Sequence, residues 1–83
     1  MGGPLTEKQK RLLFLFKKAI ENEEGAQQMY AEMRDNSREP ILKSVFEQLI
    51  REERDHEESL RNKYAELRQT DEFKDADQDL DAI

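Results

Sequence analysis

Two residues able to bind a metal interrupt an apolar stripe near the middle of the chain. In the stretch FEQLIREERDHEESL, residues 46–60, helical spacing from Leu49 to Leu60 would place apolar side chains where Glu53 and His56 stand. Residues three apart on a helix share a face, so this carboxylate and this imidazole are neighbours. A buried, unpaired carboxylate takes up a proton rather than staying ionised. The pair therefore predicts that this stripe faces a cation as well as a partner helix.

A third candidate ligand interrupts a second stripe earlier in the chain. That row has steps of three and four residues and reads Phe16, Ala19, Glu23, Ala26, Tyr30, Met33. Glu23 and Glu53 lie equally far along the chain from residue 38, which falls in a predicted turn. An antiparallel hairpin would bring Glu23 level with Glu53 and His56. Carboxylate oxygens with one imidazole suit iron(II) or manganese, and zinc less exclusively.

The elements that must position these residues are two long helices. Thr6 and Gln9 form a capping-box pattern, which predicts the start of the first helix. That helix extends to a turn at residues 36–39, and Pro40 suits the first position of the next helix. The second helix is expected to run to about Gln69. A turn this short makes the two helices antiparallel neighbours.

The ends of the chain differ in character from this hairpin, which we assign to residues 6–70. Residues 1–5 are interpreted as a disordered start or a cloning remnant. Residues 71–83 form an acidic tail, in which Thr70 can cap a short third helix. That helix would carry apolar residues at spacings of three and four, namely Phe73, Ala76, Leu80 and Ile83. The apolar run 12–16 predicts either a further subunit interface or a docking surface for the third helix.

Composition limits the class of protein. The chain has 83 residues, 41% charged and 35% hydrophobic, so it is one small domain with a modest core. The absence of cysteine excludes disulfides, zinc–thiolate sites and iron–sulfur clusters. The net charge of −6 comes mainly from the tail, and no face is basic enough to predict nucleic acid binding. Nothing resembles a signal peptide or a membrane span, so a cytoplasmic location is expected.

The number of ligands predicts that two chains share the site. One chain supplies two carboxylates and one imidazole, whereas two chains supply four carboxylates and two imidazoles. Four negative charges balance two divalent ions. Di-iron carboxylate bundles use this set, with a Glu from each of two helices and a Glu-x-x-His from each of the other two. We therefore expect an all-α fold in which two hairpins dimerise into a ferritin-like four-helix bundle, within a homodimer or a larger even-numbered homo-oligomer.

With these motifs in place, residues 8–70 resemble one half of a ferritin or rubrerythrin bundle. Glu23-x-x-Ala26-x-x-x-Tyr30 followed by Glu53-x-x-His56 is most similar to the encapsulated ferritins, which build a di-iron centre between two short chains. The resemblance implies that Glu23 is a terminal iron ligand, that Glu53 bridges two irons and that His56 binds through one ring nitrogen. It also implies that Tyr30 lies close beside these ligands.

The resemblance implies a ferroxidase that oxidises iron(II) to iron(III), with storage of the iron inside an encapsulin shell. The sequence departs from that family in two places. Asn22 and Gly25 stand where the family has acidic residues that form an accessory metal site, and the chain ends at Asp81-Ala82-Ile83 with no obvious targeting peptide. Two alternatives stay open: a rubrerythrin-like di-iron peroxide reductase, and a non-catalytic helical-hairpin oligomerisation module.

Overall fold

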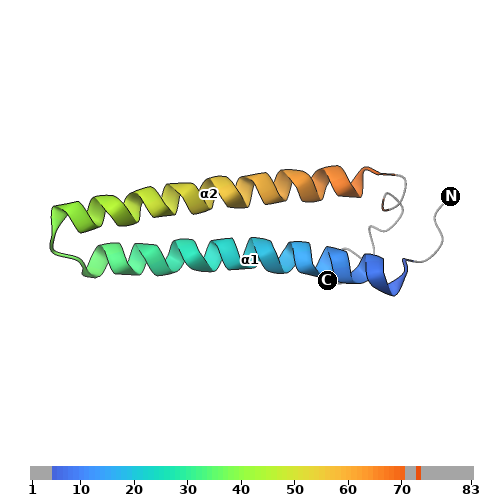
Figure 1. Ribbon diagram of the computed structural model, residues 1–83, viewed down its shortest axis with the longest axis horizontal. Helices are drawn as coiled ribbons and strands as arrows, with labels where there is room; N and C mark the ends of the chain where they lie inside the picture. The colour runs from blue at the N-terminus through green and yellow to red at the C-terminus, as the bar shows by residue number, and fades with distance from the viewer. Residues whose placement is uncertain (1–4, 71–72, 74–83) are drawn as a thin grey trace.

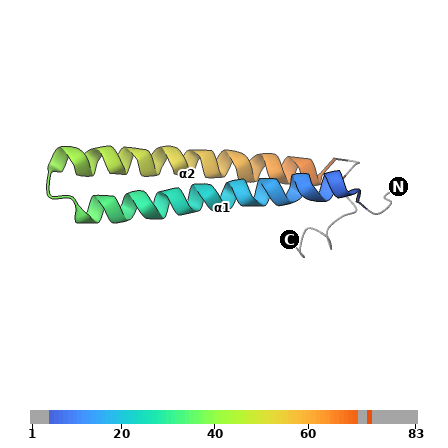
Figure 2. The same cartoon turned by 60° about the horizontal axis from the view of Figure 1, so that its bottom comes forward.

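The structure is a hairpin of two long helices. The computed structural model describes residues 5–70 and Phe73, and in this part of the chain there is no strand. Helix α1 spans Glu7–Asn36 and helix α2 spans Pro40–Arg68, and the two lie side by side (Figure 1 and Figure 2). The predicted all-α hairpin is confirmed. The predicted third helix lies outside the described residues apart from Phe73, as do residues 1–4.

Local hydrogen bonds define the helix ends. The hydroxyl oxygen of Thr6 accepts from the backbone N–H of Gln9 at 3.1 Å, and the side chain of Gln9 accepts from the backbone N–H of Thr6 at 2.7 Å. This is the predicted capping box. At the other end of α1, the Ser37 hydroxyl donates to the carbonyl of Met33 at 2.7 Å. Pro40 then opens α2 without losing a needed N–H.

The tightest packing lies at the open end of the hairpin. Leu5, Leu13 and Phe73 form a buried cluster against which Tyr64 and Leu67 pack, and Leu13 is fully inaccessible. Phe73 thus brings the chain beyond α2 back onto α1. Of the apolar run 12–16, Leu13 is covered within the chain. Three of its neighbours remain more than 40% exposed, namely Leu12, Phe14 and Leu15.

The core thins toward the turn. Ile20 is the last buried residue of α1, and Ile50 is the buried residue of α2. The radius of gyration is 17.0 Å, whereas a compact domain of this length would have about 12 Å. A single hairpin therefore leaves much apolar surface uncovered. Within the described residues neither helix carries the long uncharged apolar stretch that crossing a membrane requires.

Candidate metal centre

Three potential ligands meet midway along the hairpin. Glu23 comes from α1, and Glu53 and His56 come from α2, and one ligand atom of each lies within 4.8 Å of the others. The Nδ1 atom of His56 is 3.8 Å from Glu23 Oε2 and 3.7 Å from Glu53 Oε2. The structure therefore places the three residues singled out in the sequence in one cluster, which we call the triad.

The hairpin explains how the triad forms. Glu53 and His56 are three residues apart, so one turn of α2 carries both on one face. The short turn brings Glu23 to the same height on α1. The side chains of Glu23 and Glu53 are only 23% and 21% exposed, while that of His56 is 62% exposed. Two carboxylates thus lie partly sheltered between the helices, with an imidazole on their accessible side.

The geometry of the triad fits a divalent cation. Nitrogen–oxygen distances of 3.7 and 3.8 Å are too long for hydrogen bonds, and the buried Glu23 Oε2 has no hydrogen-bond partner among residues 5–70 and Phe73. Ligands bound at about 2.1 Å lie roughly 3 to 4.2 Å from one another around one ion, and both distances fall in that range. A cation between these atoms would satisfy Glu23 Oε2. Carboxylate oxygens and an imidazole are donors suited to iron or manganese.

The comparison with protein families agrees with these donors. The rubrerythrin family model matches residues 15–82, most of the chain, and so includes all three triad residues. The chain belongs to the rubrerythrin family. No curated protein and no solved structure gives a significant match. Membership in this family, within the ferritin-like superfamily, indicates a di-iron protein, and it agrees with the resemblance seen in the sequence at the level of the superfamily.

Among the described residues of this rubrerythrin-family chain, no hydrogen bond joins Tyr30 to the triad. It lies on α1 two turns beyond Glu23 and is half-buried. Within residues 5–70 its hydroxyl makes no hydrogen bond to any of the three ligands. That Tyr30 lies close beside the ligands and acts with them therefore stays a prediction.

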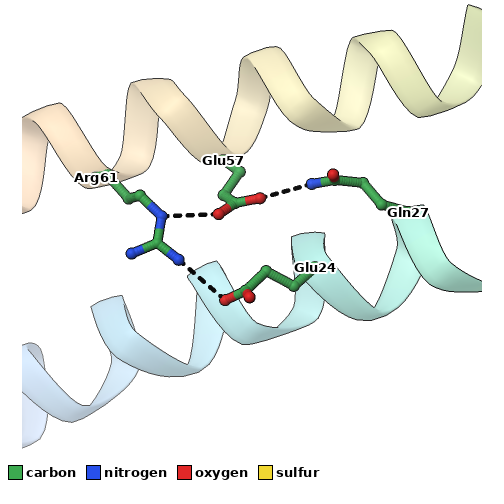
Figure 3. Close-up of polar contacts among 4 residues, drawn as sticks. All are labelled: Glu24, Gln27, Glu57 and Arg61. Carbon is green, nitrogen blue, oxygen red and sulfur yellow. Dashed lines mark hydrogen bonds and ion pairs between the residues drawn. The ribbon is translucent and has the colours of Figure 1, made fainter.

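A second polar cluster joins the two helices next to the triad, and the sequence analysis missed it (Figure 3). The Glu57 carboxylate accepts from Arg61 Nε and from Gln27 Nε2, both at 2.7 Å. Arg61 also donates to Glu24 Oε1 at 3.1 Å. We call these four residues the polar bridge. The hydrogen bond from Arg61, supported by that from Gln27, holds the pKa of Glu57 below its usual value near 4.5.

Two grooves flank these clusters. An apolar groove of about 200 Å³ is lined by Leu12, Leu15, Phe16, Ala19 and Leu60. Ala19 and Leu60 are each one turn from a triad residue, so this groove continues the side of the hairpin that carries the triad. A larger groove of about 460 Å³ includes Glu24 and Arg61 in its lining and carries charged side chains.

Proposed function

We propose that two copies of this chain form a di-iron centre that oxidises iron(II) to iron(III). The observation that carries the proposal is the triad, in which Glu23 Oε2 is buried without a hydrogen bond at a position where a cation would satisfy it. Membership in the rubrerythrin family supports iron as that cation.

The uncovered side of the hairpin supports a second copy as the source of the remaining ligands. One chain offers three donor groups, too few for two ions, whereas two chains offer the set that di-iron bundles use. Large apolar residues are exposed at helical spacing along the side that carries the triad, and Leu15, Met33, Leu42 and Val45 are between 42% and 47% exposed. A second hairpin laid on this side would bury these residues and bring its own triad to the first.

Each triad residue then has a distinct task. Glu53 would be the carboxylate ligand from α2 that both irons share, and Glu23 would be a ligand from α1. His56 would be a ligand through a ring nitrogen, and its Nδ1 atom faces both carboxylates. Iron(II) held at this centre would supply electrons for the reduction of O₂ or peroxide. The four carboxylates of the pair of chains would compensate the added positive charge of the iron(III) product.

Peroxide reduction at a rubrerythrin-like di-iron centre is the second candidate, and the family match is compatible with both. The two candidates differ in which oxidant reacts faster and in whether the centre is reduced again between turnovers. The 83 residues contain no cysteine, so an iron–thiolate electron donor would lie outside them. Comparing the rate of iron(II) oxidation by O₂ with that by hydrogen peroxide, under one set of conditions, distinguishes the two.

The test combines metal content, mass and oxidation rate. The wild type should bind about one iron per chain, shift to an even-numbered oligomer in sedimentation, and oxidise added iron(II). Glu53→Ala and His56→Ala should lose all three properties. Glu52→Ala is the matched control, because Glu52 is exposed and bonded only to Gln48 on its own helix. Full oxidation by the Glu53 or His56 variant would refute the site. A wild type that stays monomeric with iron would refute the shared centre, and one that binds no metal would favour a non-catalytic hairpin module.

Storage in an encapsulin shell is the last part of the proposal and rests on the resemblance to encapsulated ferritins. Co-expression with an encapsulin shell protein tests it directly. Enclosure of this chain in the purified shells is the expected result, and empty shells would refute this part while leaving the oxidation chemistry intact.

A further inference from the structure

The polar bridge lies one helical turn from the triad on both helices. On α1, Gln27 follows Glu23 by four residues, and on α2, Glu57 follows Glu53 by four residues. Residues four apart on a helix are neighbours on its surface. Any rotation of either helix that displaces the bridge would therefore displace the triad as well.

Buried apolar packing near this level is limited, among the described residues, to Ile20 and Ile50, each one turn from a triad glutamate. Beyond Ile20, the described part of α1 has no buried residue up to its end at Asn36, and Ile50 is the buried residue of α2. The buried cluster around Leu13 lies at the open end of the hairpin, away from the triad. Close-packed side chains normally fix the relative rotation of two helices. With so few buried side chains near the triad, a polar interaction between the helices adds a further constraint on their rotation.

The polar bridge has the geometry to fix the rotation of one helix relative to the other. Both oxygens of Glu57 are engaged, one by each helix, and Arg61 extends the network to a second residue of α1, Glu24. An arginine fork joins two carboxylates with defined angles. Among the described residues, the triad makes no hydrogen bond of its own between the helices, since His56 Nδ1 lies 3.8 Å from Glu23 Oε2. The metal-free triad therefore depends on its surroundings for its shape.

We propose that Arg61, acting through Glu57, Gln27 and Glu24, is a positioning residue for the metal centre. It fixes the rotation and spacing of α1 and α2 so that Glu23 already faces the α2 ligands before metal binds. Preorganisation of this kind raises affinity, because less ordering is required at the moment of binding. This inference rests on the proposed function for its metal readout, and it has a metal-free readout as well.

The metal readout is iron(II) affinity, measured by calorimetry without oxygen and at a temperature where every variant is folded. Arg61→Met should bind iron(II) about 10- to 100-fold more weakly, the range found when supporting residues around a metal site are removed. Arg61→Lys should recover part of the loss, because lysine keeps the charge but not the fork. Lys63→Met is the matched control and should stay within about twofold of wild type, since Lys63 pairs only with Glu66 on its own helix, at 3.5 Å.

The metal-free readout is the distance between the helices in the presence of a chelator. The sequence has no cysteine, so spin labels can be attached selectively at Asn22→Cys and Asp55→Cys, two exposed positions beside the ligands. Labelled chains are diluted with unlabelled chains so that only distances within one chain are measured. Arg61→Met should broaden or shift the distance distribution, and Lys63→Met should leave it unchanged. Gln27→Met, which removes one bond of the bridge, gives a milder variant if Arg61→Met does not fold.

The outcomes separate the inference from the function on which it rests. If the wild type binds no iron(II), the proposed function fails, and the distance measurement still decides whether the bridge positions the helices. If Arg61→Met has lower thermal stability but wild-type affinity and an unchanged distance distribution, the bridge is only a stabilising contact and the inference is overturned.

Discussion

Replacing Glu23 with methionine should stabilise the metal-free protein while removing its response to metal. Glu23 Oε2 is buried and has no hydrogen-bond partner, and leaving such a group unsatisfied costs about 1–3 kcal/mol, more for a charged one. Methionine is similar in length and apolar, so Glu23→Met should raise the free energy of unfolding by about 1–3 kcal/mol. For a domain of this size each kcal/mol raises the Tm by about 4–8 °C.

The assay is thermal unfolding, with a chelator and then with iron(II) under anaerobic conditions, at one protein concentration. Metal at 100 times its Kd should stabilise the wild type by about 2.7 kcal/mol and Glu23→Met by nothing. Glu32→Met is the control, because Glu32 lies exposed on the same helix, and it should change stability by no more than about 0.5 kcal/mol. A Glu23→Met protein that is less stable than wild type with chelator present would show that the carboxylate is well satisfied without metal. The fit of the triad to a cation would then lose its main support.

Three further predictions concern the rest of the hairpin. Gly25→Ala should raise the free energy of unfolding by about 1 kcal/mol in urea titrations, because an added Cβ would meet no atom within 4 Å; a loss of oligomer in this variant would place an interface there. Leu13→Ala should lower the free energy of unfolding by about 2–5 kcal/mol, since Leu13 is fully buried, with iron(II) affinity of the folded protein unchanged by calorimetry. The lowered pKa of Glu57 means that its bonds stabilise the fold above about pH 4.5 and that this contribution is lost as the pH falls through the lowered value. The Tm difference between wild type and Arg61→Met should therefore shrink as the pH falls below about 4.5, and a constant difference would contradict the assignment.

Features that depend on local spacing could be predicted from the sequence. The capping box at Thr6, the turn and the start of α2 at Pro40 all follow from residues within a few positions of one another. The clustering of Glu23 with Glu53 follows from one further fact, that a short turn forces the helices to run antiparallel. Equal distance from the turn then puts the two residues at one height, whatever their side-chain rotamers.

Features that depend on the rotation of one helix against the other could not be predicted. The i,i+4 spacing of Glu57 and Arg61 predicts at most a pair on one helix, and it says nothing about Gln27 or Glu24 on the other helix. The burial of Leu13 by Phe73 had the same difficulty. It requires the chain beyond α2 to return to α1, which the sequence offered as one of two interpretations of the apolar run 12–16 without deciding between them.

The location of the triad at mid-length of both helices has a consequence for fused copies of the chain. A two-fold axis through the triad can place a second hairpin pointing the same way as the first or the opposite way. The start of α1 and the end of α2 lie at one end of the hairpin (Figure 1). A tandem fusion of same-way copies needs only a few linking residues. Opposed copies need a linker that spans the length of a helix, about 45 Å. At about 3.4 Å per extended residue, that is about 13 residues or more. The shortest linker that keeps iron binding in a single fused chain would therefore measure how the two copies are oriented.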